Sequence, residues 1–215
     1  MRVEMYGDIT CPWCRLGAHQ FHRAVREAGA EQDVELVHRP YQLMPDAPDD
    51  PRPLMDAAAE LFGPEQAEAM LTGMTQVGAR EGVEYRFDRA VAVNTLTAHR
   101  LLWLALNEHG PAVQAALATA LFDAYFRDGV NIADHTRLTD LAERAGMAGR
   151  RVRDFLASGE GFAEVREQVA AARREGVTTV PRFVFGNGTQ IVGATGTEAL
   201  RDALGLSAQG VHRDG

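Results

Sequence analysis

The sequence predicts an α/β fold in which a large all-helical insertion separates the second strand from the third. Residues 2–41 are patterned as strand, helix and strand, and residues 54–175 are patterned as a series of helices. Residues 182–204 return to two strands and a closing helix. A chain of 215 residues is long enough to bury one core and to carry such an insertion.

The N-terminal part contains the first two predicted strands. Arg2–Tyr6, where apolar and polar residues alternate, is the first strand. A helix follows over Pro12–Ala28, because proline suits the first helical position and Gly29 is a typical residue after a helix end. Val34–Tyr41 is the second strand. Strand, helix and strand in this order form the unit of a parallel strand pair.

The insertion begins after a loop at residues 45–53, which contains four prolines. The acidic residues Asp46, Asp49 and Asp50 of this loop lack metal-site spacing, and we interpret them as solvated. Glycines lie between the predicted helices as stop signals, and Asp134 is placed to cap the fifth of these helices. The helices are predicted at Leu54–Phe62, Glu65–Glu81, Thr95–Glu108, Pro111–Arg127, His135–Ala145, Arg150–Ala157 and Phe162–Glu175.

The C-terminal part is predicted as a hairpin and a helix. Arg182–Phe185 and Gln190–Val192 flank the turn sequence Gly-Asn-Gly, and Thr197–Leu204 is the closing helix. We therefore divide the chain into residues 1–44 and 177–207, which form the α/β part, the insertion 45–176 and a tail at 208–215.

Composition excludes several classes of function. The net charge of −8 argues against a nucleic-acid partner, because phosphate contacts need a basic surface. All 22 basic residues are arginine, so no lysine is available as a base or Schiff-base former. No segment approaches the roughly 20 apolar residues of a membrane span, so no membrane partner is expected. No leader sequence is visible, and the expected location is the cytoplasm.

Two cysteines carry the main chemical signature. Cys11 and Cys14 lie in the sequence Cys-Pro-Trp-Cys at the predicted start of a helix. In a reducing compartment this spacing indicates redox or metal chemistry rather than a structural disulfide. Unpaired backbone N–H groups and the helix dipole favour the nucleophilic thiolate of the first cysteine. We interpret Cys11 as the attacking residue and Cys14, one turn later, as the resolving residue.

A zinc site is the alternative interpretation, because His19 and His22 follow the cysteines. On one continuous helix, however, His22 lies roughly 16 Å along the axis from Cys11, at a rise of about 1.5 Å per residue. Zinc ligands lie about 2.0–2.3 Å from the metal. We therefore expect no metal, and we expect both histidines to be partly exposed helix residues.

A second sequence of interest is Thr178-Thr179-Val180-Pro181, where a helix ends and the next strand begins. A cis bond before proline is uncommon and is usually a conserved structural feature. Opposite a Cys-x-x-Cys sequence, it would leave the backbone polar groups of Val180 available to pair with an extended substrate. The residues alone leave the isomer open, since trans is the default for an isolated Val–Pro.

Together these sequences resemble the DsbA family of the thioredoxin superfamily, and within it the FrnE-like cytoplasmic branch. The resemblance extends over nearly the whole chain and implies a thioredoxin-like fold interrupted by helices, a cis Val180–Pro181 bond and dithiol–disulfide exchange. Besides the two redox sequences, the matching segments are Arg39-Pro40-Tyr41-Gln42-Leu43, Asn94-Thr95, Ala98-His99-Arg100-Leu101, Leu121-Phe122-Asp123-Ala124-Tyr125-Phe126, Gly129-Val130-Asn131-Ile132, Gly176-Val177 and Phe183-Val184-Phe185.

The sequence also departs from the family pattern. DsbA itself is secreted and has histidine between its cysteines, whereas this chain has Pro12 and Trp13 there. Because Trp13 brings no charge to Cys11, we expect a reduction potential nearer the reducing or isomerising end of the superfamily range.

Two further polar residues are candidate modulators of the cysteines. Asp8, three residues before Cys11, is placed to influence cysteine titration or to relay protons, with an ordinary turn or cap role as the alternative. His99 lies beside a strongly apolar helix face and either faces the redox site or is a hydrogen-bonded structural histidine.

Three functions remain open. The first is a thiol–disulfide oxidoreductase or disulfide isomerase without a cofactor, in which Pro12, Trp13, Val180 and Pro181 contact a disulfide-containing protein or small molecule. Glutathione or a thioredoxin-type system would recycle it.

The second is a glutathione-dependent isomerase or transferase, similar to hydroxychromene-carboxylate isomerases and kappa-class glutathione transferases, which typically use serine at the first position of the motif. The third is a non-catalytic binding or chaperone-like module. The insertion offers surface for a homodimer contact.

Overall fold

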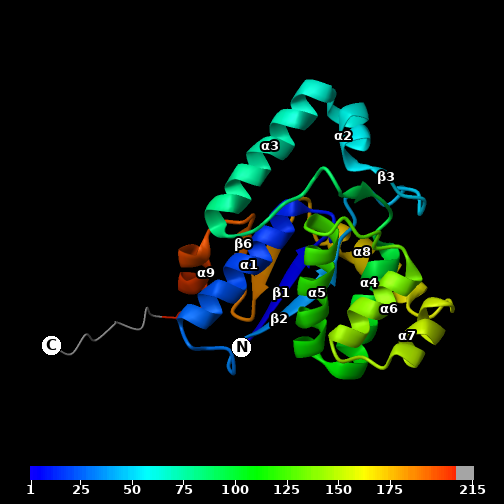
Figure 1. Ribbon diagram of the computed structural model, residues 1–215. Helices are drawn as coiled ribbons and strands as arrows, with labels where there is room; N and C mark the ends of the chain where they lie inside the picture. Colours follow the sequence, from blue (N-terminus) through cyan, green and yellow to red (C-terminus); the bar gives the residue numbers. More distant parts are fainter. Residues whose placement is uncertain (207–215) are drawn as a thin grey trace.

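A four-stranded mixed sheet forms the centre of the fold (Figure 1). The structure, a computed structural model, describes residues 1–206. In the strand order β2-β1-β5-β6, β1 pairs parallel with β2 and antiparallel with β5, and β5 pairs antiparallel with β6. Strands from both ends of the chain therefore meet at β1. The strands are β1 (Arg2–Gly7), β2 (Glu35–Pro40), β5 (Arg182–Phe185) and β6 (Gln190–Val192).

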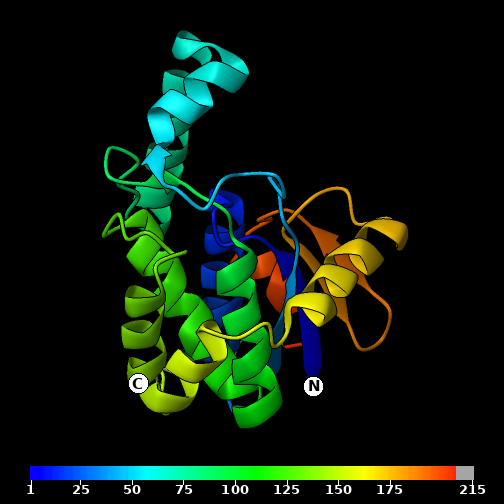
Figure 2. The ribbon, with the colours of Figure 1, turned by 90° about the vertical axis from the view of Figure 1, so that its right-hand side faces the viewer.

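Helices cover both faces of this sheet. Helix α1 (Pro12–Glu27) packs with α9 (Thr197–Ala203), and α8 (Phe162–Arg174) packs on β2. Figure 2 shows α8 on the opposite side of the sheet from α1. Under α1, the rings of Phe21 and Phe183 stack with their centroids 5.8 Å apart, so the first helix and the C-terminal hairpin share one core.

The insertion is mainly helical. Helices α4 and α5 pack beside β2, with α6 and α7 against them, whereas α2 and α3 form a hairpin that projects from the rest of the fold (Figures 1 and 2). The Asp134 side chain caps α6 by accepting the N–H groups of Thr136 and Arg137. The helices are α2 (Leu54–Phe62), α3 (Pro64–Glu81), α4 (Leu96–His109), α5 (Pro111–Phe126), α6 (His135–Arg144) and α7 (Gly149–Leu156).

Each predicted helix and strand is present, and its ends differ by no more than one residue from the prediction. The structure adds one feature that was not predicted, a two-residue antiparallel pair between β3 (Arg52–Pro53) and β4 (Val91–Ala92). No local sequence pattern predicts so short a strand pair, because its two strands are far apart in sequence. The domain boundaries stay predictions, and residues 207–215, which include the proposed tail, lie outside the described residues. No helix in residues 1–206 has the length and apolar character needed to cross a bilayer.

A glutamine side chain covers the exposed backbone of edge strand β2. Gln114 of α5 accepts the backbone N–H of His38 at 2.9 Å and donates its amide N–H to the His38 carbonyl at 3.0 Å. Edge strands need such protection because their free N–H and C=O groups can pair with another chain. The same two bonds fix α5, and with it the insertion, against the sheet.

Gly17 allows close packing between α1 and the segment that follows α8. A Cβ atom at Gly17 would lie 2.9 Å from Cγ of Pro181 and 3.3 Å from Cζ of Phe183. We predict that Gly17→Ala lowers the free energy of unfolding by about 1–3 kcal/mol, because the core must shift.

The matched control is Gly73→Ala in α3, where a Cβ atom would have no neighbour within 4 Å. This change should instead stabilise the protein by about 0.5–1 kcal/mol through helix propensity. Urea denaturation measures both variants. Equal stability changes in the two would contradict the close contact between α1 and Pro181.

Candidate active site

Cys11 is the N-cap residue of α1. Its sulfur accepts the backbone N–H of Cys14 at 3.2 Å, and its carbonyl accepts the N–H groups of Cys14 and Arg15. Pro12 occupies the first helical position, and the first turn has no acidic residue. The first sulfur therefore lies at the unpaired N–H groups of a helix start, as the sequence analysis predicts.

Cys14 lies behind Cys11 and is fully buried, whereas Cys11 is 4% exposed. Its sulfur lies close to the backbone of Gly7, since a Cβ atom there would be only 3.1 Å away. Burial, followed by the hydrogen bond and the charge of Cys11, raises the pKa of the Cys14 thiol well above its usual value. Both cysteines are free thiols in the structure. Cys14 is consequently held as the protonated thiol at neutral pH.

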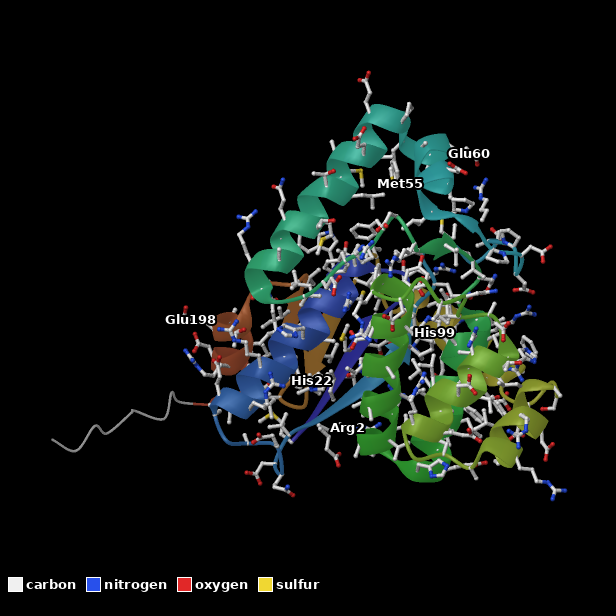
Figure 3. All side chains as sticks on the ribbon, in the orientation of Figure 1. Arg2, His22, Met55, Glu60, His99 and Glu198 are labelled. Atoms are coloured by element: carbon white, nitrogen blue, oxygen red, sulfur yellow. The ribbon has the colours of Figure 1, made fainter. Side chains whose placement is uncertain are left out.

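Asp8 and His99 are brought together, although 91 residues separate them in sequence. Their exposed fractions are 1% and 3%, and Asp8 Oδ1 lies 3.2 Å from His99 Nε2. The second carboxylate oxygen, Oδ2, accepts the backbone N–H of Leu43 at 2.7 Å. His99 comes from α4 of the insertion (Figure 3). The charge of Asp8 also acts on the Cys14 thiol, so the pair adjoins the buried sulfur.

The segment that contains Val180 and Pro181 lies against α1 at Gly17. The Val180–Pro181 peptide bond is cis, the geometry that the resemblance implies. Among residues 1–206, no hydrogen bond engages the Val180 backbone N–H or C=O. Trp13 is 46% exposed and extends the surface beside the cysteines.

Two residues near the cysteines, Arg15 and Tyr85, were not predicted. Arg15 is buried, and it donates to Asp123 Oδ1 at 2.7 Å and to the Glu84 carbonyl. Its guanidinium also lies 5.0 Å from the ring centre of Tyr85. The Tyr85 hydroxyl donates to the Pro12 carbonyl at 2.6 Å. These contacts tie the insertion to the start of α1. Nothing in the local sequence distinguishes such residues from ordinary helix and loop positions, because their partners lie 69 to 108 residues away.

His19 and His22 lie on the unbroken helix α1 and are partly exposed. Burial, together with the charge of Arg26, lowers the pKa of each imidazole. In the part of the chain that the structure describes, no group of three or more His, Cys, Asp or Glu side chains is arranged to hold a metal ion.

Comparison with known families identifies the fold. The sequence model of the DSBA-like thioredoxin domain matches residues 2–205. The chain belongs to the DsbA-like thioredoxin family. Its architecture is accordingly a thioredoxin-like fold with a helical insertion, and membership of the family supports a thiol–disulfide oxidoreductase or isomerase in general terms.

Individual relatives and solved structures are similar to this chain over nearly its whole length. The crystal structure of the probable DsbA oxidoreductase SCO1869 from Streptomyces coelicolor superposes with a TM-score of 0.84 at 34% identity, covering 95% of this chain and 88% of that one. The uncharacterized protein YwbO of Bacillus subtilis is 27% identical over 210 residues, covering 95% of this chain and 96% of YwbO. The cytosolic disulfide reductase DsbM from Pseudomonas aeruginosa shares the fold, with a TM-score of 0.62, 18% identity and coverage of 95% and 97%.

The unequal environments of the two thiols predict unequal alkylation. At about pH 7, Cys14→Ser, which retains Cys11, should react with iodoacetamide at least about tenfold faster than Cys11→Ser, which retains Cys14, because the thiolate is the reactive form. Raising the pH should accelerate the Cys14 reaction as the pH approaches the raised pKa of this thiol. Mass spectrometry over time measures both rates. Equal rates at neutral pH would contradict the assigned environments.

Proposed function

We propose that this protein is a dithiol–disulfide oxidoreductase or isomerase in which Cys11 attacks and Cys14 resolves. One observation carries the proposal: the Cys11 sulfur caps α1 and accepts the Cys14 N–H, while Cys14 is held fully buried behind it. A first sulfur at the helix start, in a residue that is 4% exposed, and a fully buried second sulfur one turn later suit sequential attack.

The exchange has two steps. The Cys11 thiolate attacks one sulfur of a substrate disulfide, so that the substrate S–S bond breaks, one substrate thiolate leaves and a mixed disulfide forms. Cys14 then loses its proton and attacks the Cys11 sulfur, which releases the second substrate thiolate and leaves a Cys11–Cys14 disulfide. Two electrons pass from the protein to the substrate, and both thiolates are protonated. Oxidation of a substrate dithiol runs the steps in reverse.

The surface around Cys11 suits a disulfide-containing polypeptide or a small disulfide. The free backbone groups of Val180 support pairing with an extended chain beside Pro181. Trp13, Leu43 and Met44 are each about half exposed, at 46–48%, and Leu43 is fixed next to the site by its bond to Asp8. This apolar rim favours partners that present apolar side chains next to the disulfide.

Glutathione is the proposed recycling partner of this protein. The proposed location is the cytoplasm, and the proposed branch of the family is the FrnE-like one. DsbM, described as a cytosolic disulfide reductase, has also been solved with glutathione, and that structure covers 95% of this chain at a TM-score of 0.59. Because the two active thiols hold the transferred electrons, the proposal requires no other cofactor.

Asp8 is the proposed acceptor for the Cys14 proton in the second step. Cys14 has no access to solvent, and the carboxylate that acts on it is Asp8. Its bonds to His99 and to the Leu43 N–H hold the carboxylate in place. A buried acceptor is needed because the raised pKa of Cys14 disfavours the attacking thiolate.

The reduction potential tests the proposed activity. In glutathione buffers the protein should show a reversible two-electron transition, with a potential between that of thioredoxin, about −270 mV, and that of protein disulfide isomerase, about −180 mV, rather than near that of DsbA, about −120 mV. The transition should be absent from Cys11→Ser, while Cys14→Ser should stop at a single glutathione adduct. Mass spectrometry after acid quenching follows each species.

Two results would count against this function. If the unmodified protein shows no transition, the dithiol mechanism fails and the glutathione-dependent isomerase takes its place. The hydroxychromene-carboxylate isomerase structure has the same fold at 15% identity, so that scaffold is compatible with either chemistry. A potential close to that of DsbA would overturn the expected reducing direction.

Removing the Asp8 charge should slow the second step selectively. With dithiobis(nitrobenzoate) as the substrate, Cys11 attack releases one coloured thiolate and Cys14 attack releases a second, so stopped-flow absorbance resolves both phases. In Asp8→Asn we expect the second phase to slow on the order of tenfold or more, since general-base catalysis contributes at least that much. The first phase should change little.

The matched control is Asp46→Asn, which removes an exposed carboxylate in the loop after β2. Both phases should keep their rates in this variant. Equal slowing of both phases in Asp8→Asn would show that Asp8 supports the fold rather than proton transfer.

A further inference from the structure

A small cavity lies between β2, α4, α5 and α8, and His99 is part of its lining. Its volume is about 10 Å³, enough for one water molecule. The lining combines apolar side chains with two imidazoles and two amides: His38, Pro40, His99, Leu102, Trp103, Leu106, Gln114 and Gln168. A water molecule is stable in a buried cavity when it finds two to four polar partners.

His38 supplies the observation that requires such a partner. The side chain is 8% exposed, and its Nε2 is buried without a hydrogen-bond partner among residues 1–206. A buried polar group that is left unpaired loses its hydration without compensation, which destabilises the fold. Burial, followed by the charges of His22 and His99, lowers the pKa of His38 to about 3. The imidazole is therefore neutral at pH 7, and one of its ring nitrogens is an acceptor.

The other cavity residues divide into used and available groups. Gln114 already donates its amide to the carbonyls of His38 and Leu102, at 3.0 and 3.2 Å. His99 bonds to Asp8 through Nε2, which leaves its second ring nitrogen, Nδ1, available for another hydrogen bond. Gln168 adds an amide from α8. A water that donates to two imidazoles and accepts from Gln168 would have three hydrogen bonds, a typical number for a buried water.

We propose that one water molecule in this cavity bridges His38 Nε2 and the second ring nitrogen of His99. The bridge supports the same His99 tautomer that the Asp8 carboxylate requires, with Nε2–H presented to Asp8, since the bond made by one imidazole nitrogen sets the proton on the other. The N–H donated to Oδ1 holds the Asp8 carboxylate in the position from which it acts on Cys14. His38 is thus a positioning residue for the second step, an inference that rests on the proposed function.

Neighbouring ionisable groups define what else acts on this network. Asp8 acts on Cys14 and on Tyr125 of α5, and it bonds to His99. His38 is influenced by His22 of α1 and His99 of α4. Loss of the bridge should therefore move the pH dependence of the Cys14 step to higher pH, because without a well-positioned acceptor this step depends on ionisation of the Cys14 thiol itself, whose pKa is raised.

Imidazole nitrogen NMR tests the water bridge independently of redox activity. In ¹⁵N-labelled protein at about pH 7, His99 should show a protonated Nε2 and an unprotonated Nδ1. His38→Leu should move the ¹⁵N shift of His99 Nδ1 toward that of an imidazole nitrogen without a hydrogen bond, whereas His38→Gln, which keeps a polar side chain, should retain the original shift. His22→Leu is the matched control, because His22 also has a buried Nε2 without a partner but does not line this cavity.

The two-phase exchange assay tests the consequence for catalysis. His38→Leu should slow the second phase about three- to tenfold and shift its pH profile upward, with the first phase unchanged, while His38→Gln and His22→Leu should keep both phases. An unaltered ¹⁵N shift of His99 Nδ1 in His38→Leu would overturn the bridge. A lower free energy of unfolding with an unchanged pH profile would reduce His38 to a structural role. If the unmodified protein lacks a second phase, the proposed function fails, and the NMR result still decides the bridge.

Discussion

The buried carboxylate of Asp8 is the contact on which the arrangement of the site depends. It lies just after β1, accepts the N–H of Leu43 from the segment after β2 and contacts His99 of α4. A buried charge is tolerated only when hydrogen bonds replace its hydration, and an unpaired one costs several kcal/mol. The sheet and the insertion therefore have to meet in one relative position, in which both partners reach Asp8.

Helix α1 is held from two sides, and this fixes where its first residue lies. On one side Gly17 permits contact with Pro181 and Phe183 of the C-terminal part. On the other, the insertion reaches the first turn through the Arg15–Asp123 ion pair and the bond from Tyr85 to the Pro12 carbonyl. The position of Cys11 at the helix start is consequently determined by three separate parts of the chain.

Local order in this protein could be predicted from sequence because glycine and proline mark nearly every boundary. Gly82 ends α3 with φ of 75°, and Pro111 opens α5, so the helices could be delimited without knowledge of their packing. Asp8 and His99 were recognised only as separate candidates. Their contact, like that of Arg15 with Asp123, depends on how the insertion docks on the sheet, and no local spacing encodes this.

The insertion is part of the reactive centre rather than a separate appendage on a thioredoxin-like fold. The two cysteines come from the N-terminal part, but Cys14 is fully buried, and the proposed exchange needs an internal acceptor for its proton. His99, which contacts the proposed acceptor Asp8, comes from the insertion. Relatives with the same Cys-x-x-Cys sequence and differently packed insertions can therefore differ in the second step of exchange, because the groups that govern it lie outside the motif.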